Sequence, residues 1–158
     1  MFTAPVREFT VVLSKFFAAF LVYLVAWAPL GLFLVSLRVE GGREFDYRPL
    51  LSFYLALACS GAGFIAMGLF FSSLTRNQVA SAILTFVGML VMTVVFIFNR
   101  GQNPDSAWGV FLTHVSYIDL WLRSLEGVVV PRLLVFHLSM AVFWLFLTTK
   151  VLEARRWS

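Results

Sequence analysis

Charged residues are missing from four long stretches of this chain. No Asp, Glu, Lys or Arg occurs for 22 positions after Lys15, 27 after Arg48, 23 after Arg76 and 17 after Arg132. A bilayer core about 30 Å thick is crossed by about 20 apolar helical residues, with a lower limit of about 17. All four stretches reach that limit, so the sequence predicts a protein that lives in a membrane.

Several chemical groupings are missing as well. The single cysteine, Cys59, excludes an internal disulfide and a cysteine-pair zinc site. The sequence has no H-E-x-x-H motif, no paired carboxylates within the apolar stretches and no phosphate-binding G-x-x-x-x-G-K-[ST] loop. We therefore expect no catalytic residue, no metal and no cofactor bound by this chain, which argues against an integral membrane enzyme.

The composition is that of a polytopic membrane protein. Hydrophobic residues make up 61% of the 158 residues and charged residues only 13%, where soluble domains have about 25%. The stretches predict an all-α fold with four transmembrane helices, at about 16–37, 50–74, 79–98 and 132–149. These spans and their connections use nearly the whole sequence, so we expect any large soluble partner to be another chain. The net charge of +4 fits contact with membrane lipid, and we do not expect nucleic-acid binding.

Basic residues do not orient the spans. Four spans put both termini on one side, and six Lys or Arg residues fall on that side against six on the other. Acidic residues differ, two against six, but they contribute little to the positive-inside rule. The charges therefore give only a weak preference for cytoplasmic termini.

Small residues recur every four positions in the second span, at Ala58, Ala62 and Ala66. Such a face lets another helix backbone approach closely, which is how membrane helices gain packing energy. This small-residue face could pack against another helix of the same chain or against another subunit, and both interpretations remain open.

One ionisable residue lies inside a predicted span. His137 falls near the outer end of the fourth span, and packing, a proton relay and ligand binding remain open for it. The second histidine, His114, falls in a connecting loop. The pair is therefore poorly placed to hold a haem between facing helices.

The connection from Asn99 to Arg132 ends in a patterned segment. Its apolar residues repeat every three or four positions, from Phe111 through Val115 and Ile118 to Leu125. This spacing predicts an amphipathic helix over 111–126 that lies in the membrane interface or re-enters between the spans. Interfacial anchoring and an outer gate both remain open as its role. The polar gate candidates are Tyr117, Asp119, Arg123 and Glu126.

The N-terminal stretch has the chemistry of a helix terminus. Pro5 follows a possible helix start at Thr3, Glu8 comes early and Lys15 late. We expect a short surface helix over this stretch that leads into the first span.

Three segments resemble permeases of type-2 ABC transporters. Thr3-Ala4-Pro5-Val6-Arg7-Glu8, followed by Leu13-Ser14-Lys15-Phe16, is similar to the cytoplasmic segment ahead of the third span in that family. The stretch GLFFSSLTRNQ at 68–78 resembles its short cytoplasmic turn between the fourth and fifth spans. The stretch LEARRW at 152–157 resembles the C-terminus of the subgroup associated with gliding motility. The segments occur in order at matching distances, so the resemblance spans essentially the whole chain.

This resemblance implies a single permease domain over 1–158 in the bacterial cytoplasmic (inner) membrane. Both termini would be cytoplasmic and the segment 111–126 extracytoplasmic. The chain would serve an exporter, with ATP on a separate ABC ATPase subunit and a second permease copy or paralogue beside it. The residues implied to contact the ATPase are Val6, Arg7, Glu8, Phe9, Arg76, Asn77 and Gln78. The family has six spans and this chain matches the last four, so we expect an N-terminally truncated or split permease.

A second class of function stays open. A membrane scaffold that packs with partners and transports nothing would also have four apolar spans, and the two missing spans favour it. The almost uniformly apolar spans do not select a transported substrate.

Overall fold

The computed structural model describes residues 8–41, 46–99, 101 and 106–156. Within these ranges the chain forms six helices and no strand: α1 (Glu8–Gly41), α2 (Arg48–Leu74), α3 (Gln78–Asn99), α4 (Ala107–Val115), α5 (Tyr117–Leu125) and α6 (Pro131–Arg156). Of these helices α1, α2, α3 and α6 are long and apolar enough to cross a membrane, and the four expected spans lie inside them. The prediction of an all-α polytopic membrane protein is confirmed.

α2 lies at the centre of the fold and packs most extensively against α6. Two of the small residues of the second span, Ala62 and Ala66, are buried in a cluster with Ala141 and Leu145 of α6 and the first turns of α1. The third, Ala58, is only partly buried. Side chains this small let α2 and α6 approach closely, which favours their packing in an apolar solvent.

Two tyrosines hold α1 against α2 in a reciprocal arrangement. The Tyr23 hydroxyl of α1 donates a 3.1 Å hydrogen bond to the Leu57 carbonyl, and its ring lies where a Cβ on Gly61 would be only 2.3 Å away. Tyr54 of α2 covers Gly31 of α1 in the same manner. Its hydroxyl donates a 3.0 Å hydrogen bond to a carbonyl of α1. Each glycine therefore leaves the room that a ring from the other helix fills.

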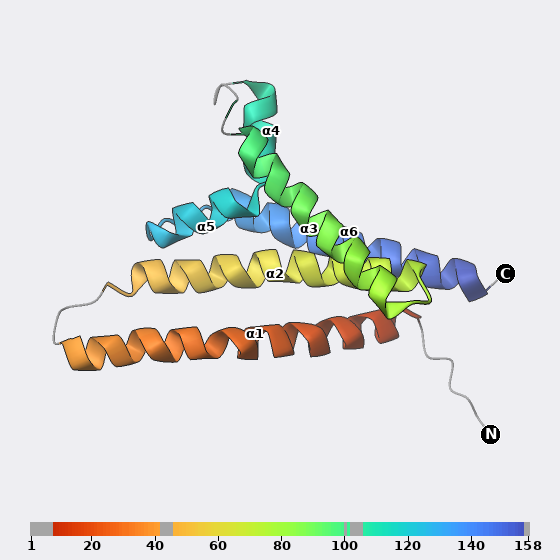
Figure 1. Ribbon diagram of the computed structural model, residues 1–158, viewed down its shortest axis with the longest axis horizontal. Coiled ribbons are helices and arrows are strands. Elements are labelled where there is room, and N and C mark those ends of the chain that lie inside the picture. The colour runs from red at the N-terminus through yellow and green to blue at the C-terminus, as the bar shows by residue number, and fades with distance from the viewer. Residues whose placement is uncertain (1–7, 42–45, 100, 102–105, 157–158) are drawn as a thin grey trace.

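α3 stands apart from the other long helices. Figure 1 shows α1, α2 and α6 running side by side, while α3 leans away from them and α4 folds back beside its far end. The apolar window of α1 has none of its residues buried and that of α3 only 6%, against 50% for α2. The described chain therefore leaves the outer faces of α1 and α3 uncovered.

Local chemistry explains the tight turn between α2 and α3. Thr75 leaves the helical conformation, and its hydroxyl donates to the Phe71 carbonyl at the end of α2. The Asn77 side-chain oxygen accepts a 2.9 Å hydrogen bond from the Val79 amide, which satisfies one of the free amides at the start of α3. A turn this short makes α2 and α3 neighbours at one end of the fold.

Two sequence predictions about helix boundaries were wrong. The segment 111–126 is not one helix, because the chain is extended at Ser116, whose hydroxyl accepts from the Asp119 amide and caps α5. The apolar spacing continues across this break, so the spacing alone does not predict it. The stretch up to Lys15 is not a separate surface helix either, since from Glu8 onward it is continuous with α1. Its first part, residues 1–7, lies outside the described residues.

Candidate functional site

The start of α1, the α2–α3 turn and the end of α6 lie together at one end of the fold (Figure 1). We call this end the terminal face; it comprises the first two turns of α1, residues 75–78 and α6 from Lys150. Near the end of α6, Arg155 donates a 2.8 Å hydrogen bond from Nη2 to the carbonyl of Leu74, the last residue of α2. This bond joins positions 81 residues apart and fixes two segments of the face to each other.

A groove of about 160 Å³ opens at the terminal face between α1, α2 and α6. Its polar lining consists of Lys15, Ser72, Ser73, Thr148 and Arg155. The two cationic side chains therefore offer hydrogen-bond donors where these helices meet, whereas the hydroxyls of Ser73 and Thr148 already donate to carbonyls of their own helices.

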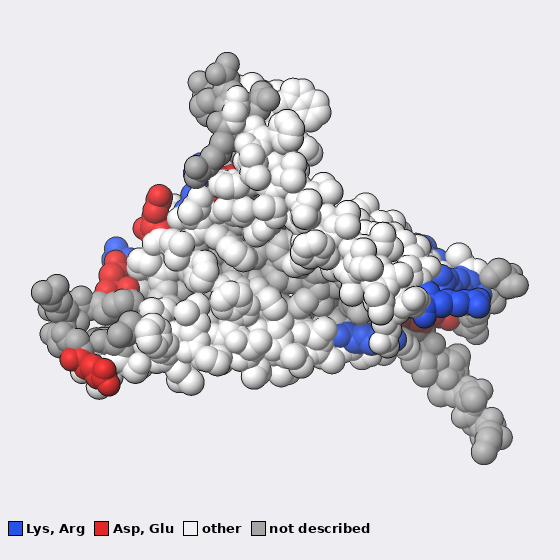
Figure 2. All heavy atoms as spheres, viewed as in Figure 1, with Lys and Arg blue, Asp and Glu red and all other residues white. Residues whose placement is uncertain are grey.

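Charged side chains lie at the two ends of the protein, and the acidic ones are unevenly divided between them. In Figure 2 Asp and Glu side chains lie mostly at the end opposite the terminal face, Lys and Arg side chains occur at both ends, and the band between them is uncharged on the visible side; the described basic residues of the opposite end are Arg48, Arg123 and Arg132. The described basic residues of the terminal face are Lys15, Arg76, Lys150 and Arg155. The described acidic residues of the opposite end are Glu40, Asp46, Asp119 and Glu126.

The residues implied to contact an ATPase fall partly on the terminal face. Glu8 is the first residue of α1, and the neighbouring Phe9 is 54% exposed. The turn residues Arg76, Asn77 and Gln78 are exposed, although the Asn77 side chain already caps α3. The remaining two, Val6 and Arg7, lie outside the described residues.

α5 is fastened to the first half of α2. The Trp121 indole nitrogen donates a 2.9 Å hydrogen bond to the Ser60 hydroxyl, and the Ser52 hydroxyl donates to the Ser124 carbonyl. On the same helix, Leu120 is 1% exposed in a small cluster with residues of α2 and α6. α5 is therefore part of the packed interior and not a helix resting on its surface.

The break between α4 and α5 lies beside the middle of the bundle. Tyr117, just after the break, packs its ring edge-on against Phe64 near the middle of α2, with ring centroids 4.9 Å apart. Its hydroxyl lies 2.9 Å from the Thr93 hydroxyl of α3. From there α5 runs outward to Ser52, near the start of α2. This course matches a re-entrant element better than an interfacial helix.

The four gate candidates have different surroundings. Tyr117 points into the bundle and Asp119 is partly buried, whereas Arg123 and Glu126 are exposed. α5 ends at Leu125, and the positive φ of 78° at Gly127 lets the Gly127 amide reach back to the Ser124 carbonyl at 3.0 Å. The structure thus places one candidate inside the bundle and two at the end of the fold opposite the terminal face.

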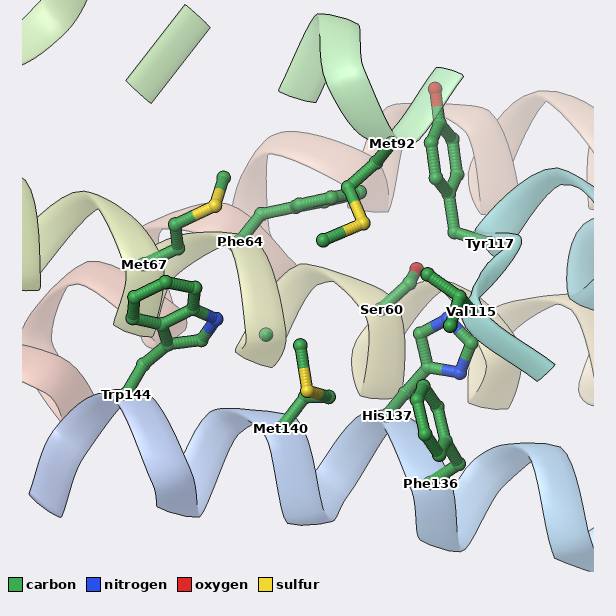
Figure 3. A pocket seen from close by; sticks show the side chains of 11 residues that line it. Ser60, Phe64, Met67, Met92, Val115, Tyr117, Phe136, His137, Met140 and Trp144 are labelled. Atoms are coloured by element: carbon green, nitrogen blue, oxygen red, sulfur yellow. The ribbon is translucent and has the colours of Figure 1, made fainter. Parts of the chain in front are cut away.

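A cavity of about 30 Å³ lies between α2, α3, α5 and α6 (Figure 3). His137 lines it and is 7% exposed. Its Nδ1 lies 2.9 Å from the Leu133 carbonyl, and its Nε2 has no hydrogen-bond partner among the described residues. Of the roles left open for this histidine, packing alone leaves the second nitrogen unexplained.

Sequence reasoning missed the polar contacts that join the helices. Ser60 lies in the small-residue segment of α2 and Trp121 in the patterned segment, but nothing in a single sequence pairs positions 61 residues apart. Arg155 entered only as one of six counted basic residues and as part of the stretch at 152–157, and neither observation pairs it with Leu74. Among the described residues, no group of three His, Cys, Asp or Glu side chains is placed to hold a metal ion.

Comparison of the chain with protein-family models, curated proteins and solved structures gives no match. Function is therefore inferred from the residues and their geometry.

Proposed function

We propose that this chain is the permease subunit of an ATP-driven ABC transporter, an exporter of the bacterial cytoplasmic membrane with both termini in the cytoplasm. One observation carries the proposal: three segments distant in the sequence meet at the terminal face, where Arg155 joins the end of α6 to the end of α2. A motor bound there would contact α1, the α2–α3 turn and α6 together. A movement of that motor would be transmitted directly to the long helices.

ATP would bind to and be hydrolysed by the partner ATPase subunit. Closure of that partner would push on the start of α1 and on the exposed turn at Arg76. α2 would transmit the push because it contacts α1, α3, α5 and α6. Work done at the terminal face would thereby shift the spans between two access states without chemistry in this chain.

The re-entrant helix α5 fits the role of an outer gate. It is held by a small number of polar bonds, including those of Trp121 and Tyr117, and its outer end carries the exposed Arg123 and Glu126. Movement of α2 against α3 would strain the two attachments differently. The uncovered apolar faces of α1 and α3 fit contact with a second permease copy or paralogue and with lipid.

Co-purification tests the proposal first. The chain is extracted from its native membrane in mild detergent, and the proteins that come with it are identified by mass spectrometry. We expect a stoichiometric ATPase with a phosphate-binding loop. Recovery of the chain with other membrane proteins and no ATPase would refute the permease and support the scaffold.

A charge exchange then tests the docking surface. In the assembled transporter, Arg7→Glu combined with Glu8→Arg should uncouple ATP hydrolysis from transport. The matched control exchanges Asp46 and Arg48, two exposed charges at the opposite end of the protein. Coupled transport in both variants would exclude Arg7 and Glu8 from docking.

A further inference from the structure

The protonation of His137 is fixed by its surroundings. Its Nδ1 lies 2.9 Å from the Leu133 carbonyl, and because a carbonyl only accepts hydrogen bonds, Nδ1 carries the proton. Nε2 of the neutral ring is then a lone-pair nitrogen. The residue is 7% exposed, and no described group donates to Nε2. A buried ligand nitrogen held in one tautomer by a backbone carbonyl is the usual form of a metal-binding histidine.

The hydroxyls that line the cavity, those of Ser60 and Tyr117, already have partners. The Ser60 hydroxyl donates to the Ala56 carbonyl at 2.9 Å and accepts from Trp121. The Thr93 hydroxyl donates to the Met89 carbonyl at 3.0 Å, so the proton of the bond between Thr93 and Tyr117 comes from the tyrosine. Neither the serine nor the tyrosine has a proton left for Nε2.

Methionine sulfurs surround the same cavity. Three of the five methionines of the chain line it, and each comes from a different helix: Met67 from α2, Met92 from α3 and Met140 from α6. Figure 3 shows their thioethers and the imidazole of His137 around a shared space. The rest of the lining is mainly apolar and aromatic and contains no carboxylate.

Thioethers and a neutral imidazole form a soft, uncharged ligand set. Such ligands select Cu(I) over hard cations such as Mg²⁺ or Ca²⁺, which require oxygen ligands. A cavity of about 30 Å³ accommodates one small occupant. The flexible methionine side chains allow three sulfurs to converge on it. We propose that this cavity binds one Cu(I) ion through Nε2 of His137 and the thioethers of Met67, Met92 and Met140.

The site does not depend on the permease function, because it is built wholly from side chains of this chain. It departs from the expectation, drawn from the sequence, that this chain binds no metal. α3 leans away from the bundle. An ion bound by residues of α2, α3 and α6 would also link this helix to the two central helices.

Cu(I) titration of the whole chain in detergent micelles tests the proposal. The titration is run without oxygen, against a chromogenic Cu(I) chelator, on a Cys59→Ser background that removes the one competing thiol. We expect one Cu(I) per chain. Met140→Leu and His137→Phe keep similar volume and should weaken binding by at least the roughly 10–100-fold that follows loss of a supporting group around a metal. Met89→Leu, in α3 but outside the cavity lining, is the matched control and should bind as the parent does.

Two readouts keep the test decisive if a variant folds poorly. X-ray absorption of the copper-loaded parent should show both sulfur and nitrogen neighbours. Ag(I), a diamagnetic substitute, should shift the NMR methyl signals of the three cavity methionines and leave that of Met89 in place. Absence of Cu(I) binding by the folded parent, a copper site without sulfur, or equal affinity in Met140→Leu and Met89→Leu would overturn the proposal.

Discussion

The indole nitrogen of Trp121 donates a 2.9 Å hydrogen bond to the hydroxyl of Ser60, and this bond joins α5 to the centre of α2. Ser60 is 1% exposed, and its hydroxyl also donates back to the Ala56 carbonyl of its own helix. The serine thus serves as an acceptor whose orientation its own helix fixes. α5 is therefore held by a polar bond inside an apolar bundle, where water does not compete for the donor.

Ser60→Ala should destabilise the protein by about 1–2 kcal/mol, because the indole N–H loses its acceptor in an apolar setting. The midpoint of unfolding in mixed micelles measures the effect. Ser139→Ala is the control, since the exposed Ser139 hydroxyl bonds only to the Phe136 carbonyl of its own helix. Equal midpoints for the two variants would show that the bond to α5 contributes nothing to stability.

Gly61→Ala should destabilise the contact between α1 and α2. The new Cβ would lie 2.3 Å from the Tyr23 ring, which its hydroxyl bond to Leu57 holds in place, and overpacking of this kind costs about 1–3 kcal/mol. Gly63→Ala, two positions along, meets only the His137 carbonyl at 3.6 Å. That variant should be neutral or stabilising by up to about 1 kcal/mol, because alanine favours helix.

A double variant tests the cause of this loss. Tyr23→Ala removes the ring that the new methyl group would meet, so adding Gly61→Ala to it should cost less than in the parent chain. An additive loss in the same unfolding measurement would place the origin elsewhere than in the Tyr23 contact.

The spans could be predicted from the sequence because the thickness of the hydrocarbon layer sets a minimum length for a charge-free helix. The break at Ser116 could not, since the apolar spacing from Val115 to Ile118 continues across it. A closer reading of Ser116 as a helix cap was possible, because serine is a favoured residue at that position. The end of a helix depends on single side chains such as Ser116, whereas a membrane span depends on the average hydropathy of about 20 residues.

The candidate sites could not be predicted from the sequence for a different reason. Arg155 and Leu74 are joined by a hydrogen bond across 81 positions, and Met67, Met92 and Met140 lie on three helices. A helical period reports which residues share a face of one helix, but not which face of another helix meets it. Contacts between helices are set by packing of the whole bundle.

Asn77→Ala separates capping from docking at the α2–α3 turn. The Asn77 side chain accepts the Val79 amide at 2.9 Å, so its loss should cost about 1 kcal/mol of stability. Asn77→Asp keeps an acceptor and should retain the stability of the parent. Gln78→Ala controls for exposure at the neighbouring position. If Asn77→Asp is as unstable as Asn77→Ala in the unfolding measurement, capping is not the role of this side chain.

Arg155→Ala should loosen the terminal face while changing global stability little, because the bond from Arg155 to the Leu74 carbonyl is exposed to water. Spin labels at Arg76→Cys and Ala154→Cys, on a Cys59→Ser background, report the distance between the α2–α3 turn and the end of α6. We expect a narrow distance distribution in the parent and a broader one in Arg155→Ala.

Lys150→Ala is the matched control for this measurement, since it removes an exposed ion pair confined to α6 and leaves the link between α6 and α2 intact. Arg155→Lys should give an intermediate distribution, because a lysine ammonium can reach the same carbonyl but lacks the planar guanidinium that fixes the geometry. Equal distributions in Arg155→Ala and Lys150→Ala would mean that helix packing alone positions the end of α6. The terminal face would then be assembled by the buried contacts of Ala62 and Ala66, without help from its charged rim.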